Sequence, residues 1–288
     1  MGPHPKGLRR CAGALRGRDA GRKAIQPDFS KPSVARMYDW LIGGRDNYPV
    51  DREACKELLQ IAPSTRELAL VNRAFLVRAV RYLAEECGIT QYIDHGSGLP
   101  TSPNVHQVVQ QFHSDARVVY VDNDPIVLGH GKMMLAEDTA TTAVILQDMR
   151  NTEAIFESDE VRRLIDRNTP IACLFVSVLH CVPEKDDPWK LVRDVARRLP
   201  PGSYLVISQL ASDDEQLRSD ITQFMREITG GNWGEVRSLD EVGRFFEGLE
   251  LVEAQAPCEV SLWRPDSEIG PRQKTKEWVE FGGVARLP

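Results

Sequence analysis

The stretch that decides the fold is Y-I-D-H-G-S-G-L-P-T-S-P-N-V-H, from Tyr92 to His106. It begins as a short apolar run that reaches an acid, Asp94, and then passes Gly96 and Gly98. Glycines directly after a strand permit a tight turn and a close approach of the backbone to a ligand. A proline soon afterwards, at position 103, suits the first turn of a helix. The stretch therefore predicts a strand, a ligand-binding turn and a helix.

Outward from this stretch, short apolar runs alternate with amphipathic segments. Strands that are apolar on both faces and alternate with helices indicate a mostly parallel α/β sheet with helices on both sides. The last part of the chain is expected to form two helices and then two strands. The helices are expected over 213–228 and from S-L-D-E, residues 238–241, and the strands at 249–255 and 259–264. The earlier strands are expected at 91–94, 117–122, 142–147, 171–179 and 204–208, and the helices between them near 103–112, 125–136, 152–166 and 188–198.

The first ninety residues have a helical pattern, with apolar residues at 34, 37, 38, 41 and 42 and further helices expected over 51–61 and 65–87. The basic N-terminal segment lacks the apolar core of a secretory signal. We therefore expect four parts: a disordered basic tail over 1–26, a helical cap or lid over 27–90, a ligand-binding domain over 91–266 and a C-terminal tail over 267–288. Within that tail, Trp278 and Phe281 are expected to return to the body.

Composition limits the classes of function. The chain has 288 residues, a formal net charge of −6 and a hydrophobic content of 42%, which fits one large globular domain with an appendage. This charge argues against a nucleic-acid partner, and no apolar run approaches the roughly 20 residues of a membrane span. The six cysteines form no C-x-x-C pair and no zinc-like spacing, so we expect free thiols, no metal and a cytoplasmic location. The oligomeric state is left open.

The second predicted strand, V-V-Y-V-D, indicates a nucleoside ligand. Asp122 follows Gly98 by 24 residues, close to the roughly 20 expected when a strand-end carboxylate binds ribose hydroxyls. Asn123 beside it is assigned to the same site. NAD and S-adenosylmethionine share these features, but a pyrophosphate requires backbone N–H donors and a third glycine. Leu99-Pro100 stands there instead, and Asp94 is placed to accept from the ammonium of S-adenosylmethionine, which is therefore the favoured cofactor.

The third predicted strand continues into V-I-L-Q-D-M-R, which places Asp148 just past its end. In S-adenosylmethionine enzymes an acid at this position commonly accepts from the adenine amino group, and the following backbone N–H, here of Met149, serves the ring. A surface loop acid is the alternative.

Taken together, four segments and an entry segment resemble a known family: D-H-G-S-G-L-P-T, V-Y-V-D-N-D-P-I-V-L, F-V-S-V-L-H-C-V-P-E-K-D-D-P, L-P-P-G-S-Y-L-V-I-S and, before them, S-K-P-S-V-A-R-M-Y-D-W-L-I-G-G-R-D-N-Y. They resemble bacterial S-adenosylmethionine-dependent methyltransferases long catalogued as a domain of unknown function, over about residues 28–264. The resemblance implies a class I methyltransferase fold, Rossmann-like, with seven strands of which the last is antiparallel. It also implies cofactor roles for Asp94, Gly96, Gly98, Asp122 and Asp148. His95 departs from the pattern, since an aliphatic residue is expected there, and Cys181 is a milder variation.

His180 at the end of the fourth predicted strand is the best-placed general base in the sequence, because ligands in open α/β sheets bind at the carboxyl ends of strands. A packed histidine bonded to backbone is the alternative. Ser177 on the same strand is expected to line the site and is assigned, with Tyr38, to the cofactor-binding residues.

The segment from Tyr38 to Tyr48 is predicted to close over the cofactor. It combines aromatic residues with a Gly43-Gly44 hinge, as lids often do. Arg45 is predicted to pair with the cofactor carboxylate, and Asn47 to hydrogen-bond it. A purely structural helix pair is the alternative.

Three functions remain open from the sequence. The first is methyl transfer to a small-molecule acceptor, which the acidic charge and the absence of a D/N-P-P-Y/F element favour. The others are a non-catalytic binder of S-adenosylmethionine and, less favoured, an NAD-dependent oxidoreductase.

Overall fold

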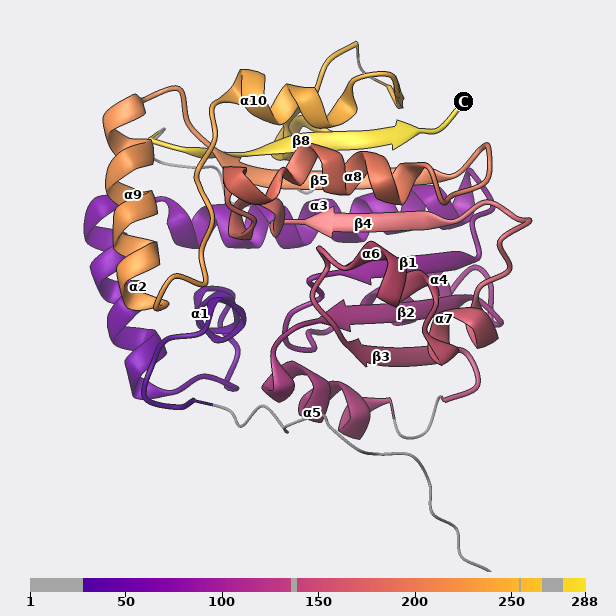
Figure 1. Cartoon of the computed structure of the whole chain (residues 1–288), viewed down its shortest axis with the longest axis horizontal. Coiled ribbons are helices and arrows are strands. Elements are labelled where there is room, and N and C mark those ends of the chain that lie inside the picture. The colour runs from indigo at the N-terminus through magenta and orange to yellow at the C-terminus, as the bar shows by residue number, and fades with distance from the viewer. Residues whose placement is uncertain (1–27, 136–138, 254, 266–276) are drawn as a thin grey trace, which may run out of the picture.

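The fold is a mixed α/β sheet covered by helices on both faces, with a helical cap at one end (Figure 1). The computed structural model describes residues 28–135, 139–253, 255–265 and 277–288. The expected basic tail over 1–26 lies outside these residues. Within these described residues the sheet has eight strands in the order β3-β2-β1-β4-β5-β8-β6, with β7 paired to β8. They are β1 (Gln91–His95), β2 (Arg117–Asp122), β3 (Thr142–Leu146), β4 (Ala172–Val176), β5 (Tyr204–Ala211), β6 (Glu250–Leu251), β7 (Cys258–Glu259) and β8 (Val279–Arg286).

The strands β1 to β5 are parallel, as the apolar runs predicted. All five residues of β1 are buried, because helices cover both of its faces. β8 is antiparallel to β5, β6 and β7, and it therefore inserts between β5 and the short β6. The expected methyltransferase-like sheet, mostly parallel with its last strand antiparallel, is confirmed. Over the residues described, it has one strand more than the seven expected, because the two-residue β7 also pairs with β8.

Two apolar cores fill the space between the sheet and its helices. One face is covered by α6 to α8 and α10, and its core includes Phe156, Phe175 and Phe245. The other face is covered by α3 to α5, and its core includes Phe75 and Trp263. The helices are α3 (Thr65–Glu85), α4 (Val105–Val109), α5 (Pro125–Met134), α6 (Thr152–Phe156), α7 (Asp159–Leu164), α8 (Pro188–Ala196) and α10 (Leu239–Gly243), with short 3₁₀ turns at Leu179–Cys181, Glu184–Asp186, Arg244–Phe246 and Val260–Leu262.

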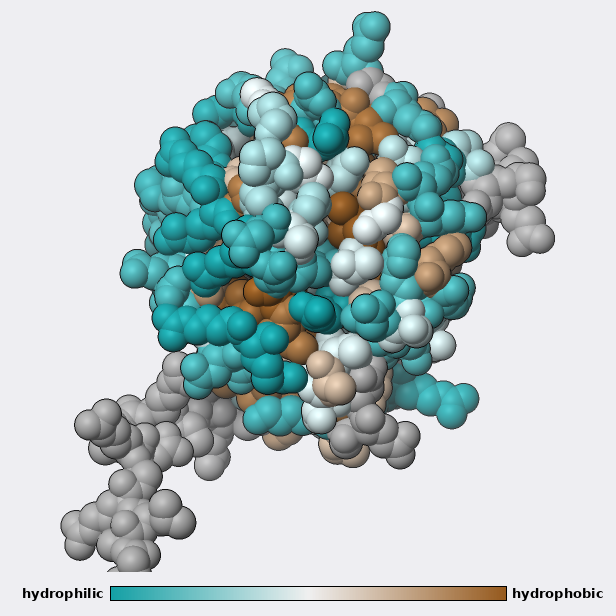
Figure 2. Space-filling view, turned by 90° about the vertical axis from the view of Figure 1, so that its right-hand side faces the viewer, coloured by the Kyte–Doolittle hydropathy of each residue, from teal (hydrophilic) through white to brown (hydrophobic). Residues whose placement is uncertain are grey.

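A third core joins the N-terminal helices to the remaining long helix at the carboxyl ends of the strands. α1 (Val34–Leu41), α2 (Pro49–Ile61) and α9 (Glu215–Ile228) contribute to it. In Figure 1 the arrowheads of β2 and β4 point toward α1 and α9. The opposite face, at the amino ends of these strands, is mostly hydrophilic, with apolar side chains in small separate areas (Figure 2). The cap therefore covers the edge of the sheet where a ligand is expected.

Three sequence predictions need correction. Residues 267–288 are not a tail beyond the domain, because Val279–Arg286 form β8 within the sheet. The strand expected over 259–264 is a two-residue β7 followed by a 3₁₀ turn. The helix expected over 152–166 breaks into α6 and α7, because Ser158 caps a new helix by accepting from Val161 N. In the described parts of the chain, no helix is both long and apolar enough to cross a membrane.

Candidate cofactor and acceptor site

A cavity of about 1440 Å³ lies at the carboxyl ends of the parallel strands. Single-ligand pockets usually measure about 300–1,000 Å³, so the cavity has room for two small molecules. One half is lined by the Gly96–Gly98 turn and the ends of β1 to β3, and we name it the glycine half. The other half, named the tryptophan half, is lined by apolar side chains from the cap, α9 and the segments around β8: Met37, Leu41, Leu58, Met225, Trp233 and Trp278.

The turn after β1 is fixed by its glycines. Gly96 and Gly98 have φ values of +67° and +66°, a region that favours glycine. A Cβ on Gly96 would also lie 2.2 Å from Val178 Cγ2. The N–H groups of Gly96 and Ser97 both donate to Val121 O, and that of Gly98 donates to Asp122 Oδ2 at 2.9 Å. The predicted strand, turn and helix are therefore present, with the turn tied to the end of β2.

These hydrogen bonds decide what the turn can bind. Besides the three donors above, Thr101 N donates to Asn104 Oδ1 and Asn104 N donates to Gln107 Oε1. Pro100 and Pro103 carry no N–H. Five backbone donors of the turn are thus used within the protein, which leaves the start of α4 poorly suited to a pyrophosphate. The geometry favours a nucleoside without phosphates, such as S-adenosylmethionine, over NAD.

Asp122 and Asn123 both line the glycine half. Burial raises the pKa of Asp122 to about 6, partly offset by backbone donors that include Asp124 N and Gly98 N. Asp122 Oδ1 accepts from Asp124 N, so each carboxylate oxygen holds one backbone group and keeps a free lone pair. The residue thus stabilises the turn and can still accept from a ribose hydroxyl, and its predicted ribose-binding role stays a prediction. Asp124 caps α5 by accepting from Ile126 N.

Asp94 and Arg73 form a complementary pair of charges at the inner end of the turn. Both line the cavity. Burial raises the pKa of Asp94 to about 7, although Arg73 acts to lower it. Arg73 Nε is buried without a hydrogen-bond partner among the described residues. Asp94 fits the ammonium and Arg73 fits the carboxylate of an amino-acid group, so the residues present fit the methionine end of S-adenosylmethionine.

Asp148 lines the cavity beside Met149, but its carboxylate is already paired. Arg150 donates to both of its oxygens and also to Asp186 Oδ2 at 2.5 Å. Burial acts to raise the pKa of Asp148, yet the hydrogen bonds from Arg150 hold it below its usual value. The adenine-binding role of Asp148 stays a prediction. In this arrangement the adenine amino group would share the Asp148 carboxylate with Arg150.

Ser177 lines the cavity at the end of β4, as predicted, and it has a partner that the sequence did not reveal. Its φ of +53° is uncommon for a residue other than glycine. Its hydroxyl donates to Glu280 Oε1 at 2.5 Å. Glu280 lies on β8 and is 1% exposed, and its Oε2 has no hydrogen-bond partner among the described residues. Burial raises the pKa of Glu280 to about 8.

His180 lines the cavity, but its surroundings make it a poor base. The ring packs against Trp233 at a tilt of 31°, with centroids 4.6 Å apart. Burial and, secondarily, the nearby Arg237 lower the pKa of His180 to about 3. An imidazole with so low a pKa has little basicity at neutral pH, which weakens the predicted general-base role. His95, the departure noted in the sequence, turns away from the cavity and stacks on Phe175 at 4.4 Å.

The cap covers the cavity, but through a different segment from the one expected. The lining residues of the cap include Asp28 and the run from Lys31 to Asp39, among them Tyr38, but not Arg45 or Asn47. The Tyr38 hydroxyl donates to Ala69 O and accepts from Asn72 Nδ2, and burial raises its pKa to about 12.

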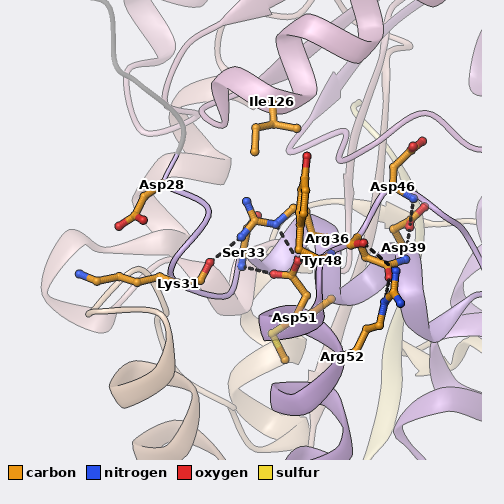
Figure 3. Close-up of polar contacts among 12 residues, drawn as sticks. Asp28, Lys31, Ser33, Arg36, Asp39, Asp46, Tyr48, Asp51, Arg52 and Ile126 are labelled. Carbon is orange, nitrogen blue, oxygen red and sulfur yellow. Dashed lines mark hydrogen bonds and ion pairs between the residues drawn. The ribbon is translucent and has the colours of Figure 1, made fainter.

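The predicted cofactor contacts of Arg45 and Asn47 are therefore wrong for this structure. Arg45 is exposed. Asn47 is buried because its amide donates to Asp39 Oδ2 at 2.7 Å and to Gly44 O, and its Oδ1 accepts from Arg52. Gly43 and Gly44 end α1 and fold the chain back onto Asp39, where a Cβ on Gly44 would lie 1.9 Å from Asp39 Oδ1. The glycine pair thus makes a packed corner, which Figure 3 shows around Asp39 and Arg52.

A buried ion pair holds the cap together. Arg36 Nε donates to Asp51 Oδ2 at 2.9 Å, and these side chains are 2% and 0% exposed. Asp51 also accepts from Ser33 N and Tyr48 N, so one carboxylate joins α1, α2 and the segment before α1 (Figure 3). Arg36 donates further to Lys31 O. These bonds place residues 31–39 over the cavity.

The sequence patterns assigned no site role to Arg73, Glu280 or Trp233, and for Trp278 they predicted only a return to the body. Arg73 lies on a helix predicted from its apolar face, and Glu280 lies in the segment predicted to be a tail. Trp233 follows Gly230-Gly231, whose positive φ values shape the turn before it. In the described residues, no group of histidine, cysteine and acidic side chains could hold a metal ion.

Comparison with known proteins shows the family of the chain. A family model described as S-adenosyl methyltransferase matches residues 20–288. The structure of a candidate methyltransferase from Thermobifida fusca is similar, with 41% identity and a TM-score of 0.83 over 90% of this chain and 96% of that one. A DUF574 family protein from Streptomyces avermitilis has 36% identity and a TM-score of 0.82, over 91% and 99% of the two chains. No curated protein matches the chain.

Proposed function

Because the chain belongs to the S-adenosyl methyltransferase family, with S-adenosylmethionine as its cofactor, we propose that it transfers the methyl group to a small-molecule acceptor in the tryptophan half. When bound, the cofactor supplies a methyl group on a positively charged sulfur, which direct displacement by a nucleophile can remove. The protein's task is to align the two molecules and to exclude water.

The observation that carries this proposal is the paired charge of Asp94 and Arg73 beside a turn whose backbone donors are used. Asp94 and Arg73 would hold the amino-acid end, and Asp122 would hold the ribose. None of these contacts needs the N–H groups that Gly96, Ser97 and Gly98 already donate within the protein.

The enclosure of the cavity supports a small acceptor. Residues from the cap and from α9 cover the strand ends, and apolar side chains line the half beyond the glycine turn. A covered apolar pocket suits a small molecule better than a nucleic acid or a protein chain, and the net charge of −6 also disfavours nucleic acid. We further propose that the protein works in the cytoplasm without binding membranes, since its described cysteines are free thiols.

Calorimetry and a transfer assay test the proposal. S-adenosylhomocysteine should bind the full chain, whereas NAD should give no heat of binding. With methyl-labelled S-adenosylmethionine and a bacterial extract, label should enter small molecules that chromatography separates from the unreacted cofactor. Label confined to protein or nucleic acid would contradict the small acceptor. Binding without any transfer would instead indicate a protein that senses the cofactor.

A further inference from the structure

The pair formed by Ser177 and Glu280 stands where the two halves of the cavity meet. Ser177 follows β4, which lies directly beside β1 in the sheet, and β1 carries Asp94. Glu280 lies opposite Leu210 in the pairing of β8 with β5, and Leu210 lines the cavity near Trp278. The pair therefore connects the end of the glycine half with the tryptophan half.

The orientation of the Ser177 hydroxyl is fixed by the backbone. Ser177 N donates to both Ser208 O and Ser208 Oγ, at 2.9 and 3.0 Å. Ser208 Oγ in turn donates to Asn72 Oδ1 at 2.6 Å, and Asn72 donates to Tyr38. This network holds Ser177 in its left-handed conformation, an arrangement that proteins keep mainly at functional sites.

The hydroxyl is also polarised in one direction. Its proton points to Glu280 Oε1, so the lone pairs of Oγ remain to accept a hydrogen bond. Because Ser177 lines the cavity and Glu280 does not, a group in the cavity would meet the hydroxyl, and the carboxyl would act through it.

Glu280 has the acidity of a group that can exchange a proton near neutral pH. Burial raises its pKa to about 8, and the hydrogen bond from Ser177 offsets this only in part. The titratable group that interacts with it from α1 is the phenol of Tyr38, whose pKa is about 12, and Arg73 interacts with that phenol. Among the described residues, the causes that shift the pKa of Glu280 are its burial and the hydrogen bond from Ser177, and neither is a cation.

The other titratable groups of the cavity fit this role less well. The pKa of His180 is about 3, and that of the Cys181 thiol is about 12. Asp148 is paired with Arg150. Asp94 and Asp122 lie in the glycine half, where the cofactor would occupy them.

We propose that Ser177 and Glu280 accept the proton that the methyl acceptor loses, and that the acceptor is therefore a protic nucleophile, a hydroxyl group or an amine. This inference rests on the proposed function. The acceptor's oxygen or nitrogen forms a bond to the methyl carbon as the sulfur–methyl bond breaks, with its electron pair staying on sulfur. The acceptor's proton passes to Ser177 Oγ as the serine's own proton passes to Glu280 Oε1. The products are the methylated acceptor, S-adenosylhomocysteine and a protonated Glu280, which later releases its proton to solvent.

An infrared titration tests the pair without an acceptor. The full chain with bound S-adenosylhomocysteine should show a protonated-carboxyl band that disappears near pH 8. The band should be missing in Glu280→Gln. In Ser177→Ala it should persist to higher pH, because the hydrogen bond that favours the carboxylate is gone. Glu259→Gln on β7 is the matched control and should leave the band unchanged. A wild-type protein without a band that titrates near pH 8 overturns the proposal.

A transfer assay tests its consequence. With labelled S-adenosylmethionine and a panel of phenols, alcohols, amines and thioethers, together with extract, wild-type transfer should rise with pH and level off above about pH 8. Glu280→Gln and Ser177→Ala should each lose about 100-fold or more in rate, the usual scale for a general base, and should lack this pH limb. Transfer by both variants at the wild-type rate and with the wild-type profile, or transfer only to thioethers, overturns the proposal.

Calorimetry separates this inference from the proposed function. S-adenosylhomocysteine should bind Glu280→Gln, Ser177→Ala and wild type with similar affinity, because the site geometry gives the cofactor's amino-acid end to Asp94 and Arg73 and its ribose to Asp122. Failure of the wild type to bind it would contradict the proposed function. Normal binding combined with an unaffected Glu280→Gln would contradict only the proton-accepting pair.

Discussion

The Ser33 hydroxyl donates to Asp124 Oδ2 at 2.8 Å and thereby fastens the segment before α1 to the first turn of α5. The two residues are 91 positions apart in the sequence. The other oxygen of Asp124 caps α5 by accepting from Ile126 N. The Asp124 carboxylate therefore contacts both α5, beside the glycine half of the cavity, and the cap segment that covers the cavity. Asp124 directly follows Asp122 and Asn123 in the sequence. A second contact, His130 with Asp46 at 3.6 Å, is largely exposed and contributes little to stability.

Removing this contact should loosen the cover. In Ser33→Ala, the loss of one hydrogen bond to a charged acceptor, about 1.5–3 kcal/mol, should accelerate release of S-adenosylhomocysteine by roughly tenfold or more. Amide exchange over residues 31–41 should also become faster. Stopped-flow fluorescence and exchange mass spectrometry measure the two effects. Ser30→Ala, which removes an exposed contact with Asp28, is the control. Equal release rates in the two variants would show that Ser33 does not retain the ligand.

Arg73→Met should weaken cofactor binding and leave the fold intact. Methionine can fill the space of the apolar part of the arginine side chain, but it cannot pair with a carboxylate. The loss should be about 1.5–3 kcal/mol, or roughly 10- to 150-fold in the dissociation constant of S-adenosylhomocysteine measured by calorimetry. Arg197→Met, at an exposed position, is the matched control. An unchanged dissociation constant in Arg73→Met would remove Arg73 from the site.

Affinity for S-adenosylhomocysteine should rise between about pH 6 and pH 8. Burial raises the pKa of Asp94 to about 7, and only its carboxylate can pair with the ligand's ammonium. The free energy of unfolding of the ligand-free protein should instead fall as pH rises. Since the folded pKa lies above the unfolded value of about 3.9, the Asp94 contribution is complete below about pH 4 and is lost as pH rises through about 7.

Calorimetry at about pH 6, 7 and 8 measures the affinity, and thermal unfolding at about pH 4, 5.5 and 7 measures the stability. Asp94→Asn should bind more weakly and should show a flatter dependence of affinity on pH. Asp122, with a pKa of about 6, titrates nearby, so Asp122→Asn serves as the comparison. If Asp94→Asn keeps the full wild-type dependence of affinity on pH, another group binds the ammonium of the ligand.

Removing one partner of the buried pair of Arg36 and Asp51 should lower the free energy of unfolding more than replacing both partners with uncharged residues. Asp51→Ala leaves the Arg36 guanidinium buried without its charge partner, which should lower the free energy of unfolding by about 3–5 kcal/mol. The double variant Arg36→Met with Asp51→Ala removes both charges and should recover part of that loss. Denaturant unfolding of the two single variants and the double variant gives the coupling energy. Additive losses would show that the pair is not coupled.

The sequence was sufficient for the elements whose signals are local. The strand ending at Asp94, its two glycines and the acid ending the second strand predicted the turn, because backbone freedom and strand-end position are properties of a few adjacent residues. The capping sequence S-L-D-E likewise predicted α10, whose Ser238 accepts from Glu241 N. The apolar strands predicted a parallel sheet for the same reason.

The sequence was insufficient where distant segments meet. Arg45 and Arg73 both belong to the N-terminal helical segment predicted over 27–90, and only packing decides that Arg73 faces Asp94 while Arg45 faces solvent. Glu280 looks like any acid of a polar tail until β8 inserts beside β5. The basicity of His180 depends on burial against Trp233, which follows it by more than fifty residues.

The position of β8 has a consequence for synthesis on the ribosome. β8 is the last strand in sequence, yet it lies inside the sheet and pairs with β5 along eight residues. While β8 is still in the exit tunnel, the nascent domain must therefore carry β5 as an open edge, which is prone to pair with other chains. The emergence of β8 both closes this edge and delivers Glu280 to Ser177. A chain whose synthesis stops before residue 279 would thus lack the proton acceptor and its protection against aggregation together.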